Sequence, residues 1–232
     1  MSSFSTLVSI FTEPGKAMEA VRERSMILLP LFLLVAGNAG LMFWYYQVVD
    51  FAWLQDYLLA ADPNLTGAMR EQARAFMTPA VLTGGAVIGV IVVIPIILLL
   101  TAVYYLLAAK VIGSDIGFGK WFAFATWTSV PSLLLLIAGA VQILMNGNGQ
   151  LAPDALNPLS LNMLFGPLPP TNSWAALLNA INLTTFWSLF VAVIGLQRWT
   201  SKPAATATII AVLPQALIFG IWALVLALRG GA

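Results

Sequence analysis

Residues 79–109 read PAVLTGGAVIGVIVVIPIILLLTAVYYLLAA, and this stretch contains no charged side chain. A helix needs about 20 consecutive apolar residues to cross the hydrocarbon core of a bilayer. The stretch exceeds that length, so we expect its helix to tilt, or to break at Gly84-Gly85 or at Pro95. This segment alone indicates a membrane protein.

The rest of the chain has the same character. Of its 232 residues, 60% are hydrophobic and 8% are charged, whereas a soluble domain carries about 25% charged residues. The runs are continuously apolar and lack the alternation of strands in a membrane barrel. We therefore predict an all-α, polytopic integral membrane protein. Its five transmembrane helices are expected over residues 26–47, 80–109, 121–145, 174–197 and 204–228.

The basic residues indicate an orientation, because positively charged loops are retained on the cytoplasmic side. In a five-span chain, Arg70, Arg74 and Arg229 fall on one side, where the loop 146–173 has no Lys or Arg. The other seven of the ten fall on the side of the N-terminus: Lys16, Arg22, Arg24, Lys110, Lys120, Arg198 and Lys202. We therefore expect a cytoplasmic N-terminus and an external C-terminus.

Residues 1–25 form an N-terminal segment ahead of a single transmembrane domain that covers residues 26–232. The segment carries apolar side chains at helical spacing, and Pro14-Gly15 then interrupts the pattern. We expect an amphipathic helix that lies in the cytoplasmic interface of the membrane. Its candidate lipid-facing residues are Phe4, Leu7, Val8 and Phe11.

The loop 48–78 predicts a helix that lies on the external surface. Asp62-Pro63 would begin it, with Asp62 as the N-cap and proline at the first helical position. Two other carboxylates of this loop, Asp50 and Asp56, are expected to be solvated rather than catalytic. We expect turns in the loop 146–173, which is rich in Pro, Asn and Gly.

Several kinds of chemistry are excluded by what the chain lacks. It contains neither cysteine nor histidine, which removes thiolate and imidazole groups as nucleophiles, bases and metal ligands. Gly147-Asn148-Gly149 lacks the remaining residues of a phosphate-binding loop, and a net charge of +1 does not favour nucleic acid. The expected spans hold no ionisable group of the kind that ion-coupled transporters use. We expect no enzyme activity, no cofactor and no metal.

Uncharged polar residues and prolines remain as candidates inside the spans. An unsatisfied amide is costly in hydrocarbon, so these side chains should point inward, either to join helices or to line a polar path. Asn179, Asn182 and Thr185 would share one side of the fourth span. Prolines can mark broken helices around a transport site. The polar candidates are Asn38, Gln142, Asn179, Asn182, Thr185 and Gln215, and the hinge candidates are Pro95, Pro131 and Pro214.

Several short motifs, taken in their order along the chain, resemble those of the Yip1 family of five-span membrane proteins. The resemblance covers most of the chain. Its best-matching pieces are Phe11-Thr12-Glu13-Pro14 with the charged turn 16–24, the segment Gly113-Ser114-Asp115-Ile116-Gly117-Phe118-Gly119-Lys120 leading to Val130-Pro131, and Trp187 with Gly195-Leu196 running into Lys202 and Ala204.

The resemblance implies a cytoplasmic N-terminus and a non-enzymatic adaptor or membrane-organising role. Eukaryotic members associate with one another and with prenylated Rab-type GTPases. Residues 1–25 are shorter than the cytosolic region of those members, which argues against GTPase binding here. The composition and small loops resemble a homologue of the bacterial cytoplasmic membrane, with the Golgi or ER membrane as the alternative.

These observations favour a membrane scaffold whose partners are the lipid bilayer and membrane proteins, including further copies of itself. Two alternatives come from other classes of protein. One is a transporter or channel for a neutral or lipid-like solute, which the prolines and the Asn179 and Asn182 stripe favour. The other is a small subunit of a larger membrane complex.

Overall fold

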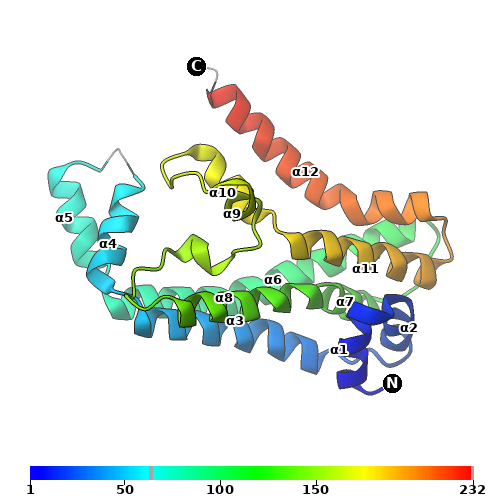
Figure 1. Ribbon diagram of the computed structural model, residues 1–232. Helices are drawn as coiled ribbons and strands as arrows, with labels where there is room; N and C mark the ends of the chain where they lie inside the picture. The colour runs from blue at the N-terminus through cyan, green and yellow to red at the C-terminus, as the bar shows by residue number, and fades with distance from the viewer. Residues whose placement is uncertain (63–64, 231–232) are drawn as a thin grey trace. The chain divides into compact units, whose positions relative to one another are not determined.

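The computed structural model describes residues 1–62 and 65–230 (Figure 1), and in these residues it is built of helices joined by short connections. No β-strand occurs in the described ranges, although Ser160 and Asn182 form an isolated bridge. The elements are α1 (Ser3–Thr12), α2 (Pro14–Arg24), α3 (Leu28–Val48), α4 (Phe51–Ala60), α5 (Gly67–Phe76), α6 (Pro79–Val111), α7 (Phe118–Thr128), the 3-10 turn η1 (Val130–Ser132), α8 (Leu133–Met145), the 3-10 turn η2 (Pro153–Leu156), α9 (Leu161–Phe165), α10 (Ser173–Ala180), α11 (Leu183–Thr200) and α12 (Ala204–Gly230).

Four stretches of the described chain are long and apolar enough to cross a membrane: α3, α6, α12 and the stretch Phe118–Met145, which joins α7, η1 and α8. They correspond to the first, second, third and fifth expected spans. Most of their side chains are not buried, and no soluble environment would accommodate so many exposed leucines, isoleucines and valines. The chain is thus an all-helical integral membrane protein in the part that the structure describes.

The fourth expected span, over residues 174–197, is not one continuous helix. Here α10 ends at Ala180 and α11 begins at Leu183, with extended backbone at Ile181 between them. The amide of Leu161 donates to the Ile181 carbonyl (2.8 Å), and the amide of Leu183 donates to the Leu159 carbonyl (3.0 Å). The loop before α9 and the first residue of α9 therefore satisfy backbone groups that the break exposes.

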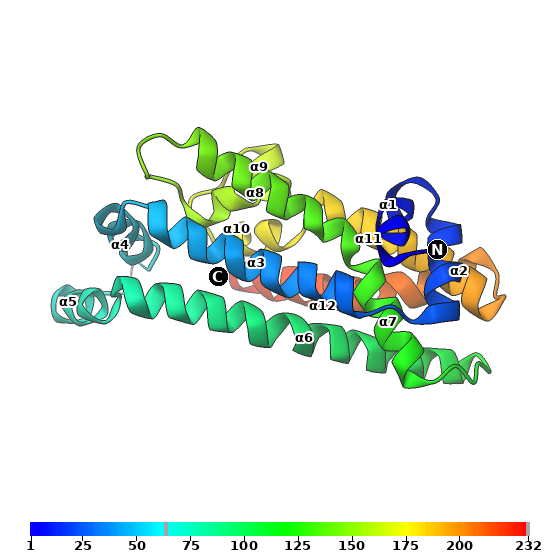
Figure 2. The same cartoon turned by 90° about the horizontal axis from the view of Figure 1, so that it is seen from below.

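The prolines expected as hinges differ in whether the helix continues through them. α6 continues without interruption past Gly84-Gly85 and through Pro95, so of the two alternatives, a tilt or a break, the break is wrong at both places (Figure 2). α12 likewise continues through Pro214. At Pro131, in contrast, the chain changes from α-helix to the 3-10 turn η1 before α8 begins.

The chain forms two compact units, and the first comprises residues 1–36, 92–133 and 184–222. Its core is aromatic and surrounds α7, where Trp121, Phe124 and Trp127 are fully buried. Trp199 of α11 packs on this cluster, with its ring centroid 5.4 Å from that of Trp121 and 5.0 Å from that of Phe124. Gly195 lets α11 approach closely, because a Cβ atom there would lie 2.7 Å from the Phe124 ring.

The second unit comprises residues 37–91, 134–183 and 223–232, of which 63, 64, 231 and 232 lie outside the described residues. Tyr45 of α3 is buried in its core and donates a hydrogen bond from its hydroxyl to the Leu151 carbonyl (2.8 Å). The expected turn before this point forms at Gly149, which has φ +72° and whose carbonyl accepts from the Asp50 amide (2.8 Å). A Cβ atom at Gly149 would lie 3.0 Å from the Val48 carbonyl oxygen, so both the backbone conformation and the space require glycine.

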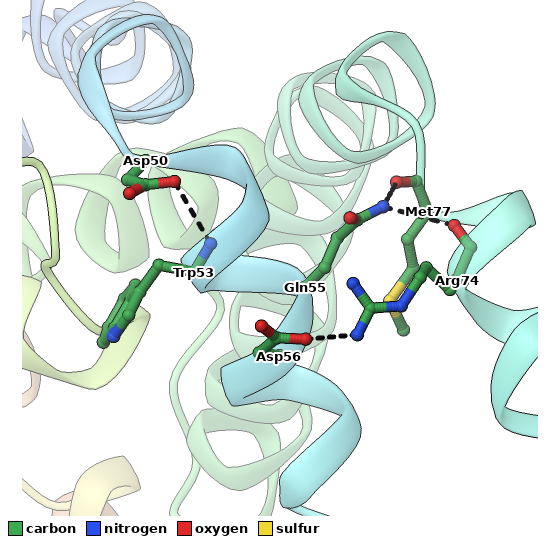
Figure 3. A network of polar contacts seen from close by, with 6 residues as sticks. All are labelled: Asp50, Trp53, Gln55, Asp56, Arg74 and Met77. Carbon is green, nitrogen blue, oxygen red and sulfur yellow. Dashed lines mark hydrogen bonds and ion pairs between the residues drawn. The ribbon is translucent and has the colours of Figure 1, made fainter.

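Within the second unit, α4 and α5 form a hairpin held by side-chain contacts (Figure 3). Gln55 Nε2 donates to the carbonyls of Arg74 (3.2 Å) and Met77 (2.7 Å), and Arg74 pairs with Asp56. Asp50 caps α4 by accepting from the Trp53 amide (3.1 Å). Asp50 and Asp56 therefore both take part in structural contacts of this hairpin.

The surface helix expected in the loop 48–78 is present as α5, but its start differs from the prediction. Thr66 is its N-cap, and the helix begins at Gly67 rather than after Asp62. Pro63, which was expected at the first helical position, lies outside the described residues.

Candidate functional site

The N-terminal helices α1 and α2 belong to the first unit, and their buried side chains join its core (Figure 1). Ser2 caps α1, and Pro14 occupies the first turn of α2, so the two helices are separated where Pro14-Gly15 predicted an interruption. The buried face of α2 carries Ala17, Met18 and Val21, which join the aromatic core. The segment 1–25 is therefore folded onto the helices of its unit.

Two tryptophan indoles donate hydrogen bonds to backbone carbonyls in α2 and just after it. Trp199 Nε1 donates to the Met18 carbonyl (2.8 Å), and Trp127 Nε1 donates to the Met26 carbonyl (2.6 Å). The first bond ties the middle of α2 to α11, and the second ties the chain two residues after α2 to α7. Sequence reasoning missed these residues, because a tryptophan near a basic residue is also the usual sign of a membrane interface.

At the surface, charged side chains also bind α2 to α11 and α7. Arg198 Nη1 lies 2.8 Å from Glu19 Oε1, and Arg22 Nη1 donates to the Arg198 carbonyl (3.2 Å). Lys120 Nζ donates to the carbonyls of Arg22 and Glu23, at the end of α2. Basic residues of three separate segments therefore lie together at one end of this unit.

The four candidate interfacial residues of α1 do not form one exposed face. Phe4 and Val8 are exposed, at 72% and 48%, whereas Leu7 and Phe11 are half-buried against the core. The face of α1 that is buried in the unit consists of Thr6, Ser9 and Ile10. Contact with lipid by Phe4 and Val8 remains a prediction.

A groove runs between the α1–α2 turn and α11, with a cavity volume of about 570 Å³. Glu13 and Lys16 line it on the side of the turn, and their side chains form an ion pair (2.7 Å). Trp187, Phe190 and Arg198 line it on the side of α11. The groove thus combines an apolar part with a charged part.

The polar residues of the fourth expected span have separate environments, because α10 and α11 are distinct helices. Asn179 Oδ1 accepts from the Ser160 hydroxyl (3.3 Å), and its backbone carbonyl accepts from Asn157 Nδ2 (3.3 Å). Asn182 lies in the break, in the bridge with Ser160, and Thr185 lies in the first turn of α11. Asn179 and Asn182 therefore contact the loop 146–173, and the break between α10 and α11 removes the continuous helical spacing on which the predicted polar stripe depended.

The remaining polar candidates lie on other helices. Asn38 is half-buried on α3 and Gln142 is half-buried on α8, both in the second unit. Gln215 follows Pro214 on α12 in the first unit, and its side-chain oxygen is buried.

Asp154, in η2, is a half-buried carboxylate that sequence reasoning did not single out. Burial raises the pKa of its carboxyl, while a hydrogen bond with the Asn179 side chain lowers it. Its charge also contributes to the raised pKa of the Tyr57 phenol, for which burial is the larger cause. Within the described residues, no group of three or more acidic side chains could hold a metal ion.

Comparison with known proteins identifies the family. A model of the Yip1 domain matches residues 8–230. The chain is also 27% identical over 202 residues to the membrane protein YknW of Bacillus subtilis (strain 168), in an alignment that covers 83% of this chain and 78% of YknW. No solved structure matches the chain. With its apolar helices and a family match over nearly its whole length, the chain belongs to the Yip1 domain family of membrane proteins.

Proposed function

We propose that this protein is a non-enzymatic scaffold of the bacterial cytoplasmic membrane, which organises membrane proteins around its N-terminal helices. It crosses the bilayer five times, with α11 as the fourth span, a cytoplasmic N-terminus and an external C-terminus. The distribution of lysine and arginine supports this topology. The bacterial relative YknW, which is named a membrane protein, supports the assignment to a bacterial membrane.

One observation carries the proposal: α1 and α2 are fixed to their unit and still leave large apolar side chains exposed. The Trp199 indole bonds α2 and the Trp127 indole bonds the chain just after it, while Phe4 is 72% exposed on α1. A rigidly held apolar side chain loses little conformational entropy when a partner covers it. This arrangement suits a docking element for membrane proteins better than a lid or a gate.

The topology can be tested by cysteine labelling without background, because the chain contains no cysteine. Single-cysteine variants Lys16→Cys, Asn148→Cys, Lys202→Cys and Arg229→Cys would be treated with a membrane-impermeant maleimide in intact cells. We expect labelling at positions 148 and 229, and labelling at positions 16 and 202 only after the membrane is opened. Labelling of positions 148 and 202 from the same side would show that α11 does not cross the membrane.

The scaffold role can be tested by placing a photo-reactive amino acid at Phe4, at Val8 or at Ile209 in living cells. Ile209 is a control, because it is 64% exposed on the apolar helix α12. We expect discrete protein adducts from positions 4 and 8 and only lipid adducts from position 209. Lipid adducts alone from all three positions would contradict the scaffold role.

A further inference from the structure

The groove beside α11 has a regular layout along the helix. Trp187, Phe190, Ile194 and Gln197 line it at spacings of three and four residues, so they form one stripe of α11. Arg198 continues the stripe at its C-terminal end. Along this stripe the side chains change from aromatic and aliphatic to polar and charged, as they would at the boundary between hydrocarbon and headgroups.

The charged end of the groove contains groups of both signs. Lys16 and Arg198 supply two cations, and Glu13 supplies an anion beside Lys16. All three are accessible, because Lys16 and Glu13 side chains are 68% and 52% exposed and that of Arg198 is 58% exposed.

We propose that this groove is a binding site for one glycerophospholipid whose headgroup carries both a phosphate and an ammonium group. The phosphate is bound by Lys16 and Arg198, the ammonium group lies near Glu13, and an acyl chain lies along Trp187, Phe190 and Ile194. The inference goes beyond the scaffold role, because it assigns a ligand to the protein itself.

The dimensions of the groove fit this ligand. From Trp187 to Arg198 the helix rises by about 16 Å at 1.5 Å per residue, which is about half of the roughly 30 Å hydrocarbon core. One leaflet of a bilayer supplies a lipid of that length. The cavity volume of about 570 Å³ lies within the range of about 300–1,000 Å³ that small-molecule sites occupy.

The charge pattern distinguishes this site from general contact with lipid. Annular lipid needs only an apolar surface, and the exposed face of α12 offers one. The groove adds a pair of cations, and Arg198 is held in place by its ion pair with Glu19. A fixed arginine loses little entropy when it binds phosphate, and such charge-assisted hydrogen bonds are stronger than neutral ones.

The test is native mass spectrometry of the full chain in detergent, with phosphatidylethanolamine or diacylglycerol of the same acyl chains added at equal concentrations. We expect one phosphatidylethanolamine per chain, retained at collision energies that strip diacylglycerol, with at least tenfold higher occupancy. Lys16→Gln should lower this occupancy several-fold, and Ile194→Trp should abolish it by filling the groove. Free glycerophosphoethanolamine should not bind, because the acyl chain contributes to the site.

Two matched controls separate this site from other effects. Lys202→Gln removes a basic residue that does not line the groove, and Ile137→Trp adds an indole to an exposed position of α8. Both should retain the lipid. Lys16 is exposed, so Lys16→Gln should have the same thermal stability as the wild type. Equal retention of both lipids by the wild type, or equal occupancy in Lys16→Gln and Lys202→Gln, would overturn the proposal.

Discussion

The Tyr104 hydroxyl on α6 donates a 2.7 Å hydrogen bond to the backbone carbonyl of Ile210 on α12. Ile210 lies four residues before Pro214, so its carbonyl would normally accept from the amide of residue 214. Proline has no amide hydrogen, and the carbonyl would be left unpaired in an apolar environment. Tyr104 supplies the missing donor, which explains how α12 can continue through Pro214.

We expect Tyr104→Phe to destabilise the protein by about 1–2 kcal/mol, because it leaves the Ile210 carbonyl unsatisfied. Equilibrium unfolding by SDS in mixed micelles would measure the change in the free energy of unfolding. Pro214→Ala restores an amide at position 214, so Tyr104→Phe should cost much less in that background. Equal costs of Tyr104→Phe in both backgrounds would contradict this role of Tyr104.

Gly195 on α11 should tolerate no side chain. A Cβ atom there would lie 2.7 Å from the Phe124 ring and 2.9 Å from Met18 Cε, and both neighbours are fully buried. We expect Gly195→Ala to destabilise the protein by about 1–3 kcal/mol, as overpacking of a core does. Gly220→Ala is the control, because no atom lies within 4 Å of its Cβ position on α12. Similar thermal stabilities of these two variants would contradict close packing at Gly195.

The sequence predicts the positions of α3, α6, α12 and the stretch Phe118–Met145, because the length of an apolar run is set by the thickness of the bilayer. Local patterns did not reveal whether a proline breaks its helix. At Pro214 the outcome depends on Tyr104, which is distant in the chain. The break between α10 and α11 depends in the same way on Leu159 and Leu161, which bond the backbone there.

The N-terminal site shows a second limit of sequence reasoning. Helical spacing predicted the helix α1, but it did not predict which side faces the protein. Thr6 and Ser9 are buried, because these small side chains let α1 approach the core, while Phe4 remains outside. An apolar side chain in a membrane protein can face either lipid or protein, since both environments are equally apolar.

The indole of Trp199 should control how firmly α2 is attached. Trp199→Phe leaves the buried Met18 carbonyl without its donor, and we expect it to loosen α2 at a cost of about 1–3 kcal/mol. Trypsin should then cleave after Arg22 and Arg24 several-fold faster than in the wild type. Trp174→Phe, which changes a partly exposed indole on α10, should leave the cleavage rate unchanged. Equal cleavage rates in the two variants would show that the indole bond does not hold α2.

Asp154 should make the packing of its loop depend on pH. Burial raises the pKa of its carboxyl in the folded state, so folding favours the protonated form. The folded loop therefore gains stability at acidic pH and loses it as the pH rises through this raised pKa. The groups around Asp154 are Asn179 of α10, Tyr57 of α4 and Tyr45 of α3, and the ordinary pKa of a phenol, about 10, lies far above this pH range.

Hydrogen exchange of residues 151–160, measured from pH 4 to pH 7, would test this dependence after correction for the intrinsic exchange rate. We expect protection in the wild type to decrease toward neutral pH. Asp154→Asn, which keeps the shape of the side chain and removes the charge, should increase protection at pH 7 and remove the trend. A wild-type protection that rises with pH would mean that the hydrogen bond with Asn179 outweighs the burial of the carboxylate.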